Sequence, residues 1–323
     1  MKAQVINGVG LAGALMASAA AVLLLSRDEG AKTQVAAEPD APDDRADAIV
    51  DARGRLVPVK AYERILSLNP VSDHILLELI EPERLVGVTR YTLDTHPERW
   101  RFGQRPGFVS SKGVERVLDL RPDLVVISKY ADEAFMARLR ETQIHVFDLG
   151  ELLGVETTVD NIRTLSKLLG IPARGVRLER DYVRNLKALE QALEGRERPP
   201  GIYLSVYGGS LFGGTRNTSY QDLLYFGGVK DMAPAHGFAG WPQYSAEEII
   251  AIDPPLVVTP GGFAATICRH AVLERIAACQ PGGRVLELPE KNHGDPGLGL
   301  VNAAQDLQRL VFGIDPRFED LNR

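Results

Sequence analysis

Residues 172–194 read PARGVRLERDYVRNLKALEQALE, and their apolar side chains recur at intervals of three and four positions. This spacing predicts an amphipathic helix of roughly six turns, about 34 Å long at 1.5 Å per residue. Gly195 and the run Pro199-Pro200-Gly201 end the helix. On both sides of it the chain alternates short β-branched runs with helical stretches. The helix therefore divides the folded chain into two similar halves.

The β-branched runs are nearly continuous in apolar residues. They span residues 64–68, 85–89, 123–128, 144–148, 202–206, 256–259 and 284–288. In the second half, helices are expected over residues 218–226, 245–252, 270–278 and 298–312. Apolar strands that alternate with helices are typical of parallel sheets buried on both faces. The sequence therefore predicts an α/β fold: two Rossmann-like lobes joined by a single long rigid helix, with the ligand cleft between them.

The first sixty residues have a different composition. Residues 6–25 are almost entirely apolar or small, which is long enough to span a bilayer as a helix. A secretory signal cleaved near Ala17-Ser18-Ala19 and an uncleaved N-terminal membrane anchor both fit, and a buried core helix is the third alternative. Either of the first two places the rest of the chain outside the cytoplasm, secreted into the periplasm or tethered to the membrane. Residues 26–55 are rich in Ala, Asp, Glu and Pro and favour a flexible tether.

The expected organisation follows from these segments. It comprises a signal sequence or anchor (1–25), a flexible acidic Ala/Pro tether (26–60), an N-terminal α/β lobe (61–171), the linking helix (172–195) and a C-terminal α/β lobe (200–315).

Composition and motifs exclude several classes of protein. The formal net charge is −6 and no basic stripe is present, which argues against nucleic-acid binding. The six histidines form no two-His motif at helical spacing, so no resident metal or cofactor is expected. An α/β enzyme would need a Gly-x-Ser-x-Gly elbow or a Gly-x-Gly-x-x-Gly fingerprint after a strand, and neither is found.

Several segments, in their order and spacing, carry a family resemblance. They are RILSLNP (64–70), LVGVT (85–89), VERVLDLRPDLV (114–125) and WPQYSAEEIIA (241–251). Together they resemble the substrate-binding proteins of ABC transporters, in the branch for ferric siderophores, haem and cobalamin. The resemblance covers about residues 62–312. It implies a monomeric binding protein that is not an enzyme. Its partners would be an ABC permease with its ATPase and a small metal-chelate ligand: a corrinoid, haem or a ferric siderophore.

Two glutamates occupy equivalent positions in the two lobes. Ser245 and Glu248 form a predicted capping box, which leaves Glu247 at the second helical position without a local partner. Glu115 has the same position after Gly113. The resemblance implies that Glu115 and Glu247 dock on arginine pockets of the permease. Two solvated glutamates that interact favourably with their helix dipoles are the alternative.

Aromatic residues follow the strands in both lobes, where ligands of α/β sheets are expected. The candidate ligand-binding residues are Tyr91, Phe108, Tyr130, Tyr207, Phe212, Arg216 and Trp241. Large rings suit a large flat macrocycle, and Arg216 suits a ligand carboxylate or phosphate. Packing is the alternative role for each ring. His236, His293 and Tyr91 are candidate axial ligands of a bound metal chelate.

The Gly-rich stretch 207–216 is interpreted as a loop through which backbone approaches the ligand, with a structural turn as the alternative. Cys268 and Cys279 are the only cysteines, and in an exported chain they are expected to form a disulfide. A catalytic thiol would need a Cys/His/Asn arrangement that the sequence does not offer. A membrane-tethered sensory or adaptor domain on the same fold remains a second hypothesis.

Overall fold

The computed structural model describes residues 47–108, 113–129, 131–289 and 297–314. The segment 6–25, Tyr130 and His293, each of which carries a prediction, lie outside the described residues. Over the ranges that are described, no helix is both long enough and apolar enough to cross a membrane.

The N-terminal sheet has five parallel strands in the order β5-β4-β3-β6-β7. The strands are β3 (Ile65–Ser67), β4 (Leu85–Thr89), β5 (Gly107–Phe108), β6 (Leu124–Ile127) and β7 (His145–Asp148). Helices of this half are α2 (Pro70–Leu79), α3 (Arg90–Thr95), α4 (Val114–Asp119), α5 (Glu133–Arg140) and α6 (Val155–Leu168). The direction of strand succession reverses between β3 and β6, which is the switch point where doubly wound sheets bind ligands.

The C-terminal sheet is mixed, with the order β11-β9-β8-β12-β13 and β10 paired to β8. Its strands are β8 (Pro200–Tyr207), β9 (Ser210–Gly213), β10 (Lys230–Asp231), β11 (Gln243–Tyr244), β12 (Leu256–Pro260) and β13 (Arg284–Leu288). Its helices are α8 (Ser219–Phe226), α9 (Ala246–Ile252), α10 (Ala264–Arg269) and α12 (Leu300–Phe312). Strands β8, β12 and β13 are parallel, whereas β9 is antiparallel to β8 because the two form a hairpin.

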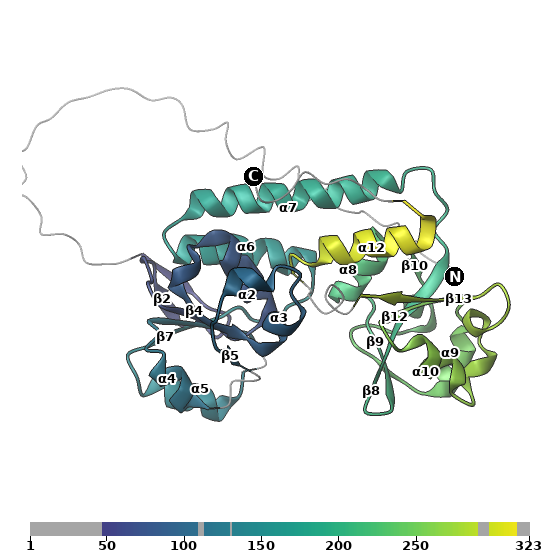
Figure 1. Ribbon diagram of the computed structural model, residues 1–323, viewed down its shortest axis with the longest axis horizontal. Coiled ribbons are helices and arrows are strands. Elements are labelled where there is room, and N and C mark those ends of the chain that lie inside the picture. Colours follow the sequence, from purple (N-terminus) through teal and green to yellow (C-terminus); the bar gives the residue numbers. More distant parts are fainter. Residues whose placement is uncertain (1–46, 109–112, 130, 290–296, 315–323) are drawn as a thin grey trace, which may run out of the picture. The chain divides into compact units, whose positions relative to one another are not determined.

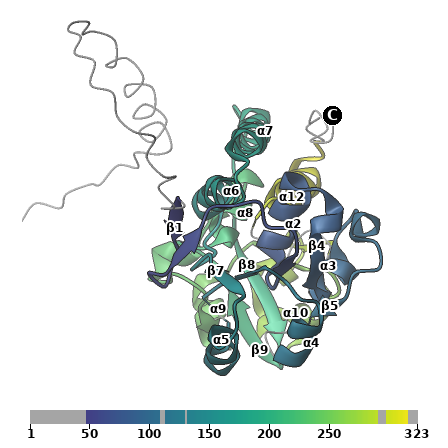
Figure 2. The ribbon, with the colours of Figure 1, turned by 90° about the vertical axis from the view of Figure 1, so that its left-hand side faces the viewer.

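The α/β prediction is thus confirmed, and the long helix is present as α7 (Pro172–Ala192). In both views α7 runs beside α6 and α12, which it contacts (Figures 1 and 2). Buried Gln308 of α12 donates from Nε2 to the carbonyl oxygens of Leu189 (2.8 Å) and Phe226 (2.6 Å). One apolar cluster includes core residues of both sheets, among them Ile65 and Tyr203. The role of α7 as the single rigid link stays a prediction.

A two-stranded antiparallel sheet precedes the N-terminal sheet. Its strands are β1 (Ala48–Val50) and β2 (Leu56–Pro58), and they fall inside the stretch 26–60 that the composition assigns to a tether. That prediction is wrong at its C-terminal end. Buried Asp51 closes the hairpin, because its carboxylate accepts from the backbone N–H groups of Arg53 and Arg55, each at 2.9 Å. Arg53 in turn pairs with buried Asp148 at the end of β7.

Helix α6 begins against α8. Gly154 is the residue before α6, and the backbone N–H of Val155 donates to Asp222 Oδ2 of α8 at 2.8 Å. Burial raises the pKa of the Asp222 carboxyl to about 6, from an ordinary value of 3.8, although the Val155 hydrogen bond opposes this shift. The contact therefore holds a carboxylate that ionises less readily than usual.

This shift predicts a pH-dependent stability. Because the folded chain binds the Asp222 proton more tightly than the unfolded chain, ionisation costs stability as the pH rises from about 4 to about 7. Asp222→Asn keeps an oxygen for the Val155 N–H and removes the buried charge. We expect the free energy of unfolding of the natural chain, relative to the Asn variant, to fall by up to roughly 3 kcal/mol across that range. Urea denaturation at both pH values checks this, and parallel pH profiles of the two proteins would contradict it.

Candidate aromatic ligand-binding face

Three of the predicted ligand-binding residues share one face of the C-terminal sheet. Phe212 of β9 pairs with Ser205 of β8 and with Gln243 of β11. Tyr207 lies two positions beyond Ser205, and Trp241 two positions before Gln243, so both project to the same face as Phe212. Backbone hydrogen bonds from Gly213 to Pro242 and from Thr215 to Gly240 continue this register past Trp241. Tyr207 is 80% exposed and Trp241 is 46% exposed, which makes this face available to a ligand.

The Gly-rich stretch that supplies Phe212 is a β-hairpin with a tight turn, which agrees with the structural-turn alternative. The approach of its backbone to a ligand stays a prediction. Gly208 and Gly209 both have positive φ, at 58° and 81°, and connect β8 to β9. A two-residue turn of this kind matches the twist of its strands and needs left-handed backbone at both positions. The hairpin fixes the strand pairing that places Tyr207 and Phe212 together.

A pair of stacked tyrosines lies on the same face and was not predicted. The rings of Tyr203 (β8) and Tyr220 (α8) are 3.9 Å apart between centroids, with an angle of 23° between their planes. Gly214 permits this stack, because a β-carbon there would lie 2.1 Å from the Tyr220 ring. Tyr203 could have been found from the sequence, because it alternates along the strand with Ser205 and Tyr207 and so projects to the same face. No sequence pattern places Tyr220 on that face.

Tyr91, from the other half of the chain, lies near enough to Tyr203 to affect the pKa of its phenol. Tyr203 has its pKa raised above the usual range for tyrosine, chiefly by burial, and the nearby Tyr220 and Tyr91 add to the shift. Tyr91 lies at the start of α3, directly after the carboxyl end of β4. The structure therefore brings a predicted residue of the N-terminal half to the aromatic face. We use the name aromatic face below for Tyr91, Tyr203, Tyr207, Phe212, Tyr220 and Trp241.

Phe108 and Arg216 lie elsewhere. Phe108 is only 4% exposed and belongs to a core cluster with Leu66 and Val117, with the Arg116 guanidinium 5.2 Å from its ring centroid. This burial favours a packing role. Arg216 follows β9 and lies near the amino end of β8. Its neighbour Thr215 donates a hydrogen bond to Asp231, and Asp231 belongs to β10, which pairs with Pro200 and Gly201 of β8.

The two predicted docking glutamates occupy equivalent places. Glu115 and Glu247 are each the second residue of a short helix, α4 and α9, and both are exposed. The Ser245–Glu248 capping box is confirmed, with hydrogen bonds of 3.2 and 2.8 Å. Glu115 forms an exposed ion pair with Arg138 of α5 at 2.9 Å. Within the described part of the chain, Glu247 has no ion-pair partner.

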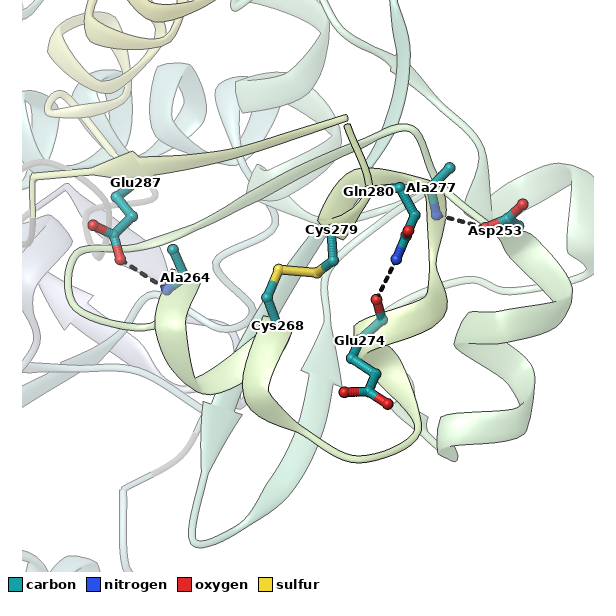
Figure 3. Close-up of a disulfide and its surroundings, with 8 residues drawn as sticks. All are labelled: Asp253, Ala264, Cys268, Glu274, Ala277, Cys279, Gln280 and Glu287. Atoms are coloured by element: carbon teal, nitrogen blue, oxygen red, sulfur yellow. Dashed lines mark hydrogen bonds between the residues drawn. A yellow bond between two sulfur atoms is a disulfide. The ribbon is translucent and has the colours of Figure 1, made fainter. Parts of the chain in front are cut away.

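Cys268 and Cys279 form a disulfide, as expected (Figure 3). The helix predicted over residues 270–278 is wrong, because the segment folds as two short 3₁₀ turns, Leu273–Arg275 and Ala277–Cys279. Its backbone is held from outside: Ala277 N–H donates to Asp253 at 2.7 Å, and Gln280 donates to the Glu274 carbonyl at 2.6 Å (Figure 3). The disulfide therefore links the irregular segment 270–279 covalently to α10.

A resident metal would need several side chains that converge on one ion. In the described ranges, no group of three or more His, Cys, Asp and Glu side chains is placed to hold a metal ion. His236 is exposed at the end of the 3₁₀ turn Ala233–His236 and is not among the aromatic-face residues. The chemistry of the aromatic face is therefore that of stacking, apolar contact and phenol hydrogen bonding.

Comparison with known proteins identifies the class. A periplasmic heme-binding protein from Pseudomonas aeruginosa superimposes with a TM-score of 0.66 at 23% identity, covering 80% of this chain and 95% of that one. The cobalamin-binding protein of Halobacterium salinarum is 26% identical over 198 residues, which is 61% of this chain and 53% of that protein. This chain thus spans about half the length of that relative. YvrC of Bacillus subtilis, an uncharacterized ABC transporter substrate-binding lipoprotein, is 24% identical over 224 residues, 67% of this chain and 70% of that protein.

The two sheets and this superposition define a two-lobed α/β fold. The family model described as "Periplasmic binding protein" matches residues 65–291. The chain belongs to the periplasmic binding protein family.

Proposed function

We propose that this protein is the extracytoplasmic substrate-binding component of an ABC importer, and that it captures a metal-chelate ligand: cobalamin, haem or a ferric siderophore. The aromatic face is the observation that carries the proposal. It presents Tyr207, Phe212 and Trp241 on one side of the C-terminal sheet and draws Tyr91 from the N-terminal half. Stacking and apolar burial against such rings are the main contributions to binding a large flat macrocycle.

The names of similar proteins support this ligand class. One relative is a cobalamin-binding protein, and a protein of the same fold binds heme. The exposed phenol of Tyr207 offers a hydrogen-bond donor to ligand oxygens. Capture is non-covalent, and delivery to the permease follows through Glu115 and Glu247.

The location outside the cytoplasm has its own support. The family is named for periplasmic proteins, and one relative is a substrate-binding lipoprotein. The Cys268–Cys279 disulfide suits an oxidising compartment. We propose that residues 6–25 direct export of the chain, as a cleaved signal or as a membrane anchor.

The proposed function predicts ligand-dependent quenching of Trp241. The chain has two tryptophans, and Trp100 is 74% exposed outside the aromatic face, so a Trp100→Phe variant of the full chain reports on Trp241 alone. We expect saturable quenching by one of cobalamin, haem or a ferric siderophore, because each absorbs light and would stack near the indole ring. In the natural chain, Trp241→Ala should weaken that ligand about tenfold, equivalent to roughly 1.4 kcal/mol.

Trp100→Phe is the matched control and should leave the affinity unchanged. Equal affinity in the Trp241→Ala variant would remove the aromatic face from the binding site. Failure of all three ligand types to bind would overturn the metal-chelate proposal while leaving the family assignment intact.

A further inference from the structure

A second pocket lies in the C-terminal half, away from the exposed end of the aromatic face. It has a volume of about 320 Å³ and is lined by Arg198, Arg216, Tyr225, Lys230 and Asp231, among others. Lys230 and Asp231 pair with Pro200 and Gly201, at the amino end of β8. Tyr207 ends the same strand, and a strand that rises 3.3 Å per residue separates it from Pro200 by about 23 Å. No residue of the aromatic face lines the pocket.

The pocket gathers three cationic side chains. Arg198 is held in place, because it donates to the Tyr225 carbonyl at 2.7 Å and its guanidinium lies 4.5 Å from the Tyr225 ring centroid. Arg216 and Lys230 are exposed, and neither forms an ion pair or side-chain hydrogen bond with another residue in the described part of the chain. Two cations thus remain available to a ligand, beside a third whose orientation is fixed.

Asp231 does not neutralise these cations by direct contact. Its two carboxylate oxygens accept from the Thr215 hydroxyl and from the backbone N–H of Ala233 (3.0 Å). Burial raises the pKa of Asp231, which lowers the cost of placing an anion nearby. With Asp231 ionised the lining still carries an excess of two positive charges, which matches the charge of a phosphate monoester.

The remaining wall is mainly apolar but includes the polar side chain of Gln221. Val229 and Pro234 face the pocket together with the ring of Tyr225. An inorganic anion would leave this wall uncovered, whereas an organic group would bury it. The volume is at the lower end of the roughly 300–1,000 Å³ that small-molecule sites occupy.

We propose that this pocket binds a small organic phosphate monoester, with Arg198, Arg216 and Lys230 on the phosphate and Tyr225, Val229 and Pro234 on the organic group. Arginine suits this role because its planar fork makes paired hydrogen bonds to phosphate oxygens. The site is separate from the proposed metal-chelate site. The sequence groups Arg216 with the candidate metal-chelate residues, whereas this proposal assigns it to the phosphate monoester.

The test is calorimetric titration of the full chain with phenyl phosphate, inorganic phosphate and benzyl alcohol. We expect one-to-one binding of phenyl phosphate and much weaker binding of the other two, which each carry half of the recognised chemistry. Arg216→Gln with Lys230→Gln should lower the affinity for phenyl phosphate about tenfold or more, because two charge-assisted contacts are lost. The matched control is Lys187→Gln with Arg275→Gln, two exposed cations outside the pocket, which should bind as the natural chain does.

Three results would overturn the proposal: no binding of phenyl phosphate, equal binding of inorganic phosphate, or unchanged affinity in the Arg216/Lys230 double variant. Vesicles of phosphatidylglycerol form a further arm. Binding to these vesicles without binding to phenyl phosphate would assign the cations to a lipid surface instead and also overturn the proposal. Metal-chelate binding, followed by Trp241 fluorescence in a Lys230→Gln single variant, should be unchanged, so the two proposals can fail separately.

Discussion

Gly154→Ala is expected to destabilise the folded chain by roughly 2–6 kcal/mol, the largest single effect on stability that we predict. Gly154 has a φ of +126°, a conformation that residues with a β-carbon rarely adopt. An added β-carbon would also lie 2.1 Å from Asp222 Oδ2 and 3.1 Å from the Ser219 Cα atom. The Ser219 atom belongs to the backbone and cannot rotate away. Backbone strain and steric overlap therefore add at one position.

The consequence reaches beyond the loop. The same Asp222 oxygen accepts the first free N–H of α6, from Val155, so moving the carboxylate to relieve the overlap also breaks that hydrogen bond. Helix α6 and helix α8 belong to different halves of the chain. Loss of this contact should therefore loosen the packing between the halves as well as the start of α6.

Urea denaturation of the purified full chain, followed by circular dichroism, measures the effect. Gly170→Ala is the matched control, because Gly170 also has positive φ (70°) but no atom within 4 Å of an added β-carbon. The control should cost only about 1 kcal/mol, the strain of left-handed backbone alone. Equal losses at the two glycines would show that the approach of Asp222 and Ser219 contributes nothing.

The longer parallel strands of the two sheets could be predicted because apolar residues dominate their composition, whereas β5, β9, β10 and β11 were not predicted. Strands β4 (Leu85–Thr89) and β12 (Leu256–Pro260) begin where the apolar runs do and end within one residue of them. A strand covered on both faces must be apolar at successive positions, so its pattern needs no knowledge of its partners. Helix α7 was predictable for a similar reason, since one apolar stripe repeats along its whole length.

The β1–β2 hairpin could not be predicted, because its stability comes from distant partners. Arg53 pairs with Asp148 and with Glu133, which lie 95 and 80 positions away along the chain. Locally the segment has the charges and small residues of a tether. The composition of a segment indicates how much apolar surface it can bury. It does not indicate which carboxylates from distant parts of the chain, such as Asp148 and Glu133, will pair with its arginine.

The candidate site shows the same division. The sequence alone identifies Tyr207, Phe212 and Trp241 as aromatic residues at expected loop positions, but only the pairing of Phe212 with Ser205 and Gln243 shows that they share a face. A shift of one residue in that pairing would move Phe212 to the opposite face of the sheet. Phe108 follows the same sequence logic and is buried, because the packing of α4 over β5 covers it.

Charge reversal at the two proposed docking glutamates is the second large effect we predict, and it concerns transport. Glu115→Lys or Glu247→Lys should each lower uptake of the transported ligand about tenfold, and the double variant should lower it further. The reason is that a lysine facing an arginine pocket of the permease replaces attraction with repulsion, which costs several kcal/mol at an interface, and each 1.4 kcal/mol is about tenfold. Uptake is measured in cells that depend on this protein for the ligand.

Ligand affinity separates a docking defect from a folding or binding defect. Both glutamates are exposed and lie outside the aromatic face, so Trp241 quenching should be unchanged in each variant. In the Glu115→Lys variant the new lysine lies beside Arg138, the ion-pair partner of Glu115. Adding Arg138→Glu restores an ion pair at this place but not the negative charge at position 115. Uptake should therefore stay low in that double variant.

Glu194→Lys, an exposed charge reversal just after α7, is the control that should transport normally. Normal uptake in the Glu115/Glu247 double variant would show that these two carboxylates are solvated ends of short helices and that the permease recognises another surface.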